Sequence, residues 1–185
     1  ASYVQQLWTL YDVPNYVRNL FNAPVVVYSG ELDKQIQAAR VMEEAYQKEG
    51  RVLPHVIGPG MGHQYHPDSL KQIMKQMDEA VKKGLDQVPA EVRLQTRTLR
   101  YNRVHWVKAT GLEEHWQDSR IDARMISKDK IEVTTRNIRS FQLSPFADMS
   151  AVTISVDGTE LTAPADGTRA DPGTAILHKG TDGTF

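Results

Sequence analysis

A carboxylate and an imidazole occupy comparable places in the first half of the chain. Asp33 follows the apolar run at residues 24–28 and the pair Ser29-Gly30, and His63 ends the glycine-rich segment at residues 58–63. A carboxylate that accepts a hydrogen bond from histidine Nδ1–H fixes the ring tautomer and leaves Nε2 available as a general base. These residue types predict acid–base chemistry if the fold brings the two segments together.

Each of these residues also has a simpler interpretation. Aspartate is among the best helix N-caps, so Asp33 alone is compatible with a capping role. His63 alone is compatible with a solvated loop histidine. The glycines of residues 58–63 allow a sharp bend and the close approach of a neighbour. However, the segment lacks both the G-x-G-x-x-G spacing of a dinucleotide-binding loop and the Lys-Ser/Thr pair of a P-loop.

The elements around Asp33 and His63 alternate between helix and strand. The β-branched run at 24–28 is typical of a strand buried on both faces, and residues 52–57 predict a second short strand. Apolar residues recur with the helical period in the segments expected to be helices, which are 3–11, 14–22, 34–49 and 67–84. This order predicts the edge of a doubly wound α/β sheet.

The two strands must be neighbours for the chemistry to work. A right-handed crossover through the helix at 34–49 places them side by side. Functional groups in open α/β sheets lie beyond the carboxyl ends of the strands, where both Asp33 and His63 are found. We therefore expect the carboxylate and Nδ1 to lie within hydrogen-bond distance, about 2.6–3.2 Å.

The pattern changes near a polar, proline-containing hinge at residues 85–91. Two domains are expected, at 1–88 and 89–185, and the second has strand-like segments and no substantial helix. Those segments are 92–101, 104–109, 121–126, 130–135, 138–143, 152–156, 159–161 and 175–178. Asp157-Gly158 predicts a type I′ hairpin turn. An all-β antiparallel sandwich or partial barrel is expected, truncated or disordered at its end, where residues 163–174 are rich in Gly, Pro, Asp and Thr.

The segments Val-Val-Val-Tyr-Ser-Gly-Glu-Leu-Asp at 25–33 and Gly-Met-Gly-His at 60–63 resemble the acid and histidine segments of the α/β-hydrolase fold. More narrowly, they resemble serine peptidases of the prolyl-oligopeptidase (S9) type. The resemblance covers about residues 1–88, and the β-rich remainder is similar to the C-terminal β-domain of large bacterial members. It implies the C-terminal portion of a doubly wound hydrolase sheet, with a triad in the chain order Ser, Asp, His.

Several functional expectations follow from this resemblance. Asp33 is the triad acid, preferred over Glu31 because it has the family's spacing after Gly30, and His63 is the base. The substrate in the intact protein is a peptide, no cofactor is needed, and an extracytoplasmic location, periplasmic or secreted, is favoured. No serine lies in G-x-S-x-G, so the nucleophile would precede Ala1 and this chain alone would be inactive.

We expect one of two partners for this chain, and one alternative function stays open. The strand at 24–28 would have an open apolar edge, which invites pairing with the missing N-terminal hydrolase portion or self-association. Alternatively, the chain is a non-catalytic protein- or carbohydrate-binding module on a degenerate hydrolase scaffold.

Other chemistries have less support. A net charge of −1 gives no nucleic-acid footprint, and the Arg93 and Arg97 side chains share one strand face. The chain has no cysteine and no apolar run of the roughly 18 residues that a membrane span needs. His55 and His66 lie near His63 in the sequence, but a metal site also needs a third ligand with defined geometry. Residues 63–66 lack helical placement and a glutamate base, so no metal site is expected. The remaining candidates are aromatic or basic residues, which we expect mainly in the core, in cross-strand pairs or on a polar face: Arg100, Arg103, His105, Trp106, His115 and Trp116.

Overall fold

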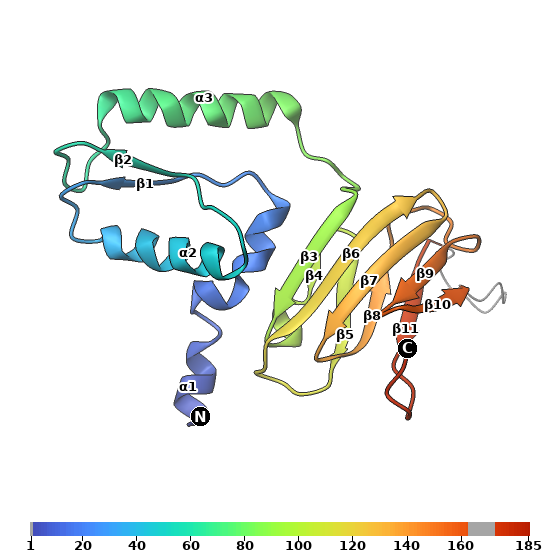
Figure 1. The fold of residues 1–185 in the computed structure, drawn as a ribbon. Coiled ribbons are helices and arrows are strands. Elements are labelled where there is room, and N and C mark those ends of the chain that lie inside the picture. The colour runs from blue at the N-terminus through green and yellow to red at the C-terminus, as the bar shows by residue number, and fades with distance from the viewer. Residues whose placement is uncertain (1, 163–172) are drawn as a thin grey trace. The chain divides into compact units, whose positions relative to one another are not determined.

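The computed structural model describes residues 2–162 and 173–185. The chain divides into two compact units, Ala23–Asp86 and a second unit that combines Ala1–Asn22 with Gln87–Phe185. It is rich in sheet, with three separate sheets and few helices (Figure 1). Most of the segment expected to end the second domain irregularly, residues 163–172, lies outside the described residues.

The unit Ala23–Asp86 is built on a parallel pair of strands, β1 (Val27–Gly30) and β2 (His55–Gly58). Two helices, α2 (Ile36–Lys48) and α3 (Pro67–Lys83), lie on opposite faces of the pair (Figure 1). The expected order of strand, helix, strand and helix is found. The sheet of this unit has two strands.

Proline and glycine mark the ends of the helices in this unit. Pro67 opens α3, where its missing N–H costs no hydrogen bond, and Gly84 ends the helix with φ 73°. Gly50 follows α2 with φ 69°, a left-handed conformation that glycine adopts without strain. The crossover helix α2 buries Ala39, Ala45 and Tyr46, so it is amphipathic as its period predicts.

The larger unit is a two-sheet β structure. One sheet has the order β10-β9-β7-β6-β3 and the other β11-β8-β5-β4. Their bounds are β3 Glu91–Thr96, β4 Arg103–Val104, β5 Val107–Leu112, β6 Ser119–Ser127, β7 Lys130–Arg136, β8 Ile138–Leu143, β9 Thr153–Val156, β10 Thr159–Thr162 and β11 Ala175–His178. Both sheets contribute to one core, in which Leu94, Ile121, Phe141 and Leu143 are almost fully buried.

Three details differ from the sequence-based expectation. The sheets are not wholly antiparallel: the chain passes from β7 into β8 of the other sheet and returns as β9 alongside β7, which makes that pair parallel. The strand expected at 92–101 ends at Thr96 and is followed by the short 3-10 helix η2 (Leu99–Tyr101). The strand expected at 104–109 is a hairpin of β4 and β5 that turns at His105, where φ is 46°.

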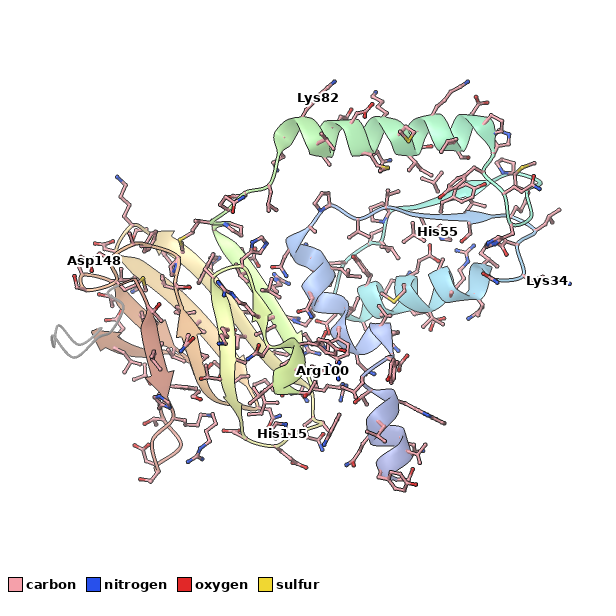
Figure 2. The ribbon with its side chains drawn as sticks, turned by 180° about the vertical axis from the view of Figure 1, so that it is seen from behind. Lys34, His55, Lys82, Arg100, His115 and Asp148 are labelled. Atoms are coloured by element: carbon pink, nitrogen blue, oxygen red, sulfur yellow. The ribbon has the colours of Figure 1, made fainter. Side chains whose placement is uncertain are left out.

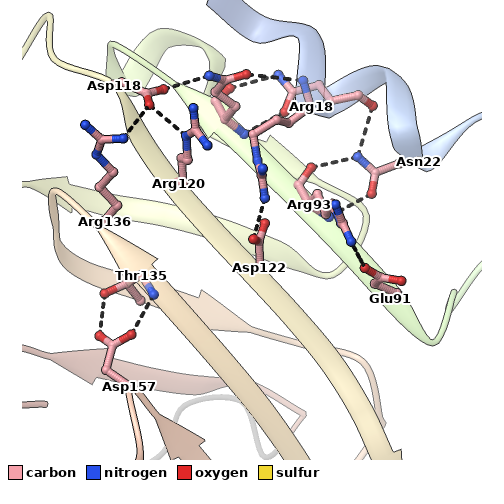
Figure 3. Close-up of polar contacts among 12 residues, drawn as sticks. Arg18, Asn22, Glu91, Arg93, Asp118, Arg120, Asp122, Thr135, Arg136 and Asp157 are labelled. Carbon is pink, nitrogen blue, oxygen red and sulfur yellow. Dashed lines mark hydrogen bonds and ion pairs between the residues drawn. The ribbon is translucent and has the colours of Figure 1, made fainter. Parts of the chain in front are cut away.

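The hairpin between β9 and β10 has the expected turn. Asp157 and Gly158 both have positive φ, 50° and 89°, as a type I′ turn requires. The Asp157 carboxylate also accepts hydrogen bonds from the backbone N–H and the hydroxyl of Thr135, both at 2.7 Å (Figure 3). Trp106 is buried in the core as expected, whereas Trp116 is only half-buried.

The sequence pattern predicts that residues 1–22 belong with the α/β domain, but the structure places them in the β-rich unit. They form α1 (Tyr3–Trp8) and the 3-10 helix η1 (Val13–Asn22), and η1 packs against β3. Arg18 on η1 is buried and pairs with Asp122 of β6 (Figure 3). An amphipathic segment buries its apolar face equally well on either unit, so periodicity alone does not identify its partner.

Two asparagines of η1 complete the edge of β3. The Asn19 side chain donates to the Gln95 carbonyl at 2.8 Å and accepts from the Gln95 N–H at 2.7 Å. Asn22 does the same with Arg93, at 2.7 and 2.8 Å (Figure 3). Because β3 is the last strand of its sheet, these amides satisfy backbone groups that an edge strand otherwise exposes.

Candidate active site

The two loops with Asp33 and His63 leave the same end of the parallel pair. Gly30, the last residue of β1, stands opposite Gly58, the last residue of β2. Asp33 follows Gly30 by three residues and His63 follows Gly58 by five. Lys34, the neighbour of Asp33, marks this loop in Figure 2, while His55 marks the first residue of β2.

The structure brings the predicted acid and base together. His63 Nδ1 lies 2.9 Å from Asp33 Oδ2, within the distance expected from the sequence. The geometry suits the tautomer in which Nδ1–H donates to the carboxylate and Nε2 is the acceptor. The Asp33 side chain is 12% exposed and that of His63 is 79% exposed. The imidazole is thus held from one side and accessible from the other, as a general base must be.

Asp33 is held in its ionised form by two hydrogen bonds. Its Oδ1 accepts from the backbone N–H of Gln35 at 2.8 Å, and its Oδ2 faces His63. The Gln35 N–H, followed by the His63 side chain, lowers the pKa of Asp33 below its ordinary value. The N-cap of α2 is Gln35, so Asp33 does not cap this helix. Its carboxylate instead accepts the Gln35 N–H within a local turn and also orients the histidine.

Gly30 allows the two loops to approach closely. A Cβ at this position would collide with the carbonyl oxygens of Met61 and Gly62. In place of a side chain there are backbone hydrogen bonds: Glu31 N–H donates to Gly58 O at 2.9 Å and Leu32 N–H to Met61 O at 2.8 Å. Backbone hydrogen bonds therefore join the acid loop to the histidine loop.

Glu31, the competing candidate for the acid, faces a different partner. Its Oε2 accepts a hydrogen bond from the backbone N–H of Gly60 at 2.7 Å. The geometry thus selects Asp33 as the carboxylate against His63. Sequence reasoning did not assign this contact to Glu31, although a glutamate two residues before Asp33 and a glycine-rich loop opposite were visible in the pattern.

Tyr28 is a second residue of the site that sequence reasoning missed. Its hydroxyl donates to the Gln64 carbonyl at 2.8 Å and accepts from the His66 N–H at 2.9 Å. Its ring also lies against that of Tyr65, with centroids 4.5 Å apart. The side chain of a β1 residue therefore holds the loop just after His63.

A second histidine–carboxylate pair lies in the same unit. His55 Nδ1 is 2.9 Å from Glu43 Oε1, and the His55 side chain is only 3% exposed. His55 is labelled in Figure 2. Its Nε2 is buried without a hydrogen-bond partner. Hydrogen bonds from Arg40 and, less strongly, from His55 lower the pKa of Glu43. Because substrate cannot reach this imidazole, we interpret the pair as part of the packing between α2 and β2.

Among the described residues, no cluster of three or more His, Asp or Glu side chains could hold a metal ion. No helix within residues 2–162 or 173–185 is long and apolar enough to cross a membrane. Comparison with protein-family models, with curated proteins and with solved structures gave no match. The interpretation of the site therefore depends on its geometry and on the sequence resemblance.

Proposed function

We propose that this chain is part of a serine hydrolase, most closely a peptidase of the prolyl-oligopeptidase type, with Asp33 as the triad acid and His63 as the base. The observation that carries the proposal is the 2.9 Å contact between His63 Nδ1 and Asp33 Oδ2, made by loops that follow two adjacent parallel strands. The resemblance of residues 25–33 and 60–63 to the family's acid and histidine segments supports it independently.

The geometry specifies what each residue would do. As the serine oxygen attacks the scissile carbonyl, His63 Nε2 takes the hydroxyl proton, and Asp33 stabilises the resulting imidazolium. The imidazolium then gives that proton to the leaving amine, which departs and leaves an acyl-enzyme. His63 next deprotonates a water that attacks the ester, and the serine regains a proton as the acid product leaves.

The serine nucleophile would come from outside residues 1–185, since no serine here lies in G-x-S-x-G. The two-stranded sheet supports this part of the proposal. Parallel strands normally lie inside larger sheets that are covered on both faces, whereas within the described residues β1 and β2 pair only with each other. The outer edge of β1 would pair with the remaining hydrolase strands or, in their absence, with a second copy of this chain.

The test uses the intact protein of which this chain is a part. We would measure kcat/KM for a peptide anilide and for a matched ester, in wild type and in the His63→Ala and Asp33→Asn variants. Loss of either triad member should lower kcat/KM by about 10⁴-fold, because the base is removed or its tautomer is wrong. Asp68→Asn, a change at an exposed aspartate on α3, is the matched control and should retain activity.

The outcomes separate the alternatives. Amide hydrolysis that depends on both His63 and Asp33 supports a peptidase, and hydrolysis of the ester alone supports an esterase on the same site. Hydrolysis that is unchanged in His63→Ala contradicts the proposal. An intact protein that hydrolyses neither substrate favours the non-catalytic binding module.

A further inference from the structure

We infer that Tyr28 and Glu31 are positioning residues that hold the His63 loop against Asp33. The inference deepens the proposed function and rests on it for the chemistry of His63. The contacts themselves do not depend on any activity. They concern the segment between Gly60 and His66, whose backbone places the histidine.

Glu31 holds the loop before His63. Its carboxylate accepts from the N–H of Gly60 at 2.7 Å, and Gly60 has a left-handed φ of 64°. A hydrogen bond to an ionised acceptor is about twice as strong as one between neutral groups. Glu31 thus attaches the turn of the glycine-rich loop to the turn that follows β1.

Tyr28 holds the loop after His63. Its hydroxyl connects the Gln64 carbonyl and the His66 N–H, so one side chain satisfies two backbone groups of the loop. The hydroxyl lies over Gly58, where a Cβ would collide with it. The glycine at the end of β2 therefore leaves the space in which Tyr28 reaches the loop.

The histidine itself has few restraints. Its side chain is 79% exposed, and Asp33 is its one hydrogen-bond partner among the described residues. The position of its ring therefore depends on the loop backbone, which Glu31 and Tyr28 hold on either side. Asp33 belongs to the same short segment, and its N–H donates to Gly30 O at 3.1 Å. Residues 28–33 thus supply the acid and both supports for the base.

A misplacement of about 1 Å in a catalytic group can cost roughly 10²-fold in rate. In the intact protein, Tyr28→Phe and Glu31→Ala should each lower kcat by about 10- to 10²-fold while KM changes little. A merely structural contact would not alter the His63 tautomer, so the tautomer is the decisive readout. The Nδ1–H form should dominate in wild type because Asp33 accepts that proton.

The experiment uses the 185-residue chain labelled with ¹⁵N-histidine at about pH 8, above the usual titration range of histidine. Long-range ¹H–¹⁵N spectra report the protonated nitrogen, and His63→Asn assigns the His63 signals among the six histidines. Asp33→Asn gives the reference state without the carboxylate. Tyr28→Phe and Glu31→Ala each remove a side-chain contact with the loop and should shift the His63 signals toward that reference.

Each variant has a matched control. Tyr65→Phe removes the hydroxyl of the adjacent tyrosine ring, which makes no hydrogen bond among the described residues. Glu44→Ala changes an exposed glutamate on α2. Both controls should keep the wild-type tautomer. If Tyr28→Phe fails to fold, the Glu31→Ala variant, at an exposed position, decides the question alone.

The result is separable from that of the proposed function. A wild-type His63 tautomer in folded Glu31→Ala and Tyr28→Phe overturns the inference, whether or not the intact protein hydrolyses peptides. A shifted tautomer supports the positioning roles. If the intact protein is nevertheless inactive, the hydrolase proposal fails while the positioning of His63 stands.

Discussion

Gly30 of β1 stands directly opposite Gly58 of β2, and this pairing starts the acid and histidine loops from the same place. Neither residue leaves room for a side chain. The Gly30 site faces the carbonyls of Met61 and Gly62, and the Gly58 site faces the Tyr28 hydroxyl. The contact between Asp33 and His63 therefore begins with two glycines at the ends of neighbouring strands.

Gly30→Ala should destabilise the unit Ala23–Asp86 and separate the loops. The added methyl must displace backbone atoms, and overpacking of this kind costs about 1–3 kcal/mol. Urea denaturation should show the lower free energy of unfolding, and the His63 tautomer should shift as in Asp33→Asn. Gly62→Ala is the control, because a Cβ there meets nothing within 4 Å. Equal stability of the two variants would contradict this account of the close approach.

The Asn19 and Asn22 side chains should stabilise the β-rich unit. Replacing both with alanine leaves the Arg93 and Gln95 backbone groups without these partners, at a cost of about 1–3 kcal/mol each where the groups stay buried. The free energy of unfolding should fall, and the open β3 edge should promote association in sedimentation experiments. Asn15→Ala, at an exposed contact with Asp12, is the control. A double variant as stable as this control would show that the asparagines do not support β3.

The Glu43–His55 pair should make stability depend on pH. Because the pKa of Glu43 is lowered in the folded chain, its ionised form stabilises the fold above the usual glutamate pKa. That contribution is lost as the pH falls through the lower, folded-state value. Glu43→Ala should cost about 1–3 kcal/mol near pH 7, since it leaves His55 Nδ1 buried without its acceptor.

The difference between wild type and Glu43→Ala should shrink as the pH approaches about 3, below the usual glutamate pKa near 4.3. Urea denaturation at both pH values measures it. Glu44→Ala, on the exposed side of α2, should show little cost at either pH. A Glu43→Ala cost that is independent of pH would mean that the charge of Glu43 does not contribute.

The sequence was informative where local pattern and chain order determine the structure. Strand and helix periods, together with one crossover helix, predicted the parallel pair and the distance between Asp33 and His63. The Asp157-Gly158 turn followed in the same way, because its conformation depends on two adjacent residues. These features need no knowledge of contacts between distant segments.

The missed features all depend on long-range contacts. The apolar period of residues 14–22 predicts an amphipathic helix, but only the fold shows that β3 is the partner of η1. Asn19 and Asn22 lie in a segment whose sequence predicts only a helix, and the structure alone shows that their amides lie beside a strand edge. The reach of Tyr28 to Gln64 and His66 depends on the path of the loop, which no short-range pattern encodes. The parallel pairing of β9 with β7 also depends on distant contacts, because the chain first crosses to the other sheet as β8 and then returns beside β7.

The most direct test of the central claim is the reaction of the intact protein with a fluorophosphonate, which phosphonylates the activated serine of serine hydrolases. We expect one serine in G-x-S-x-G outside residues 1–185 to be labelled, at a rate that falls by about 10³-fold or more in His63→Ala. His115→Ala, at an exposed histidine of the β-rich unit, should react like wild type. Absence of labelling, or labelling that His63→Ala leaves unchanged, would contradict the assignment of Asp33 and His63 as a hydrolase acid and base.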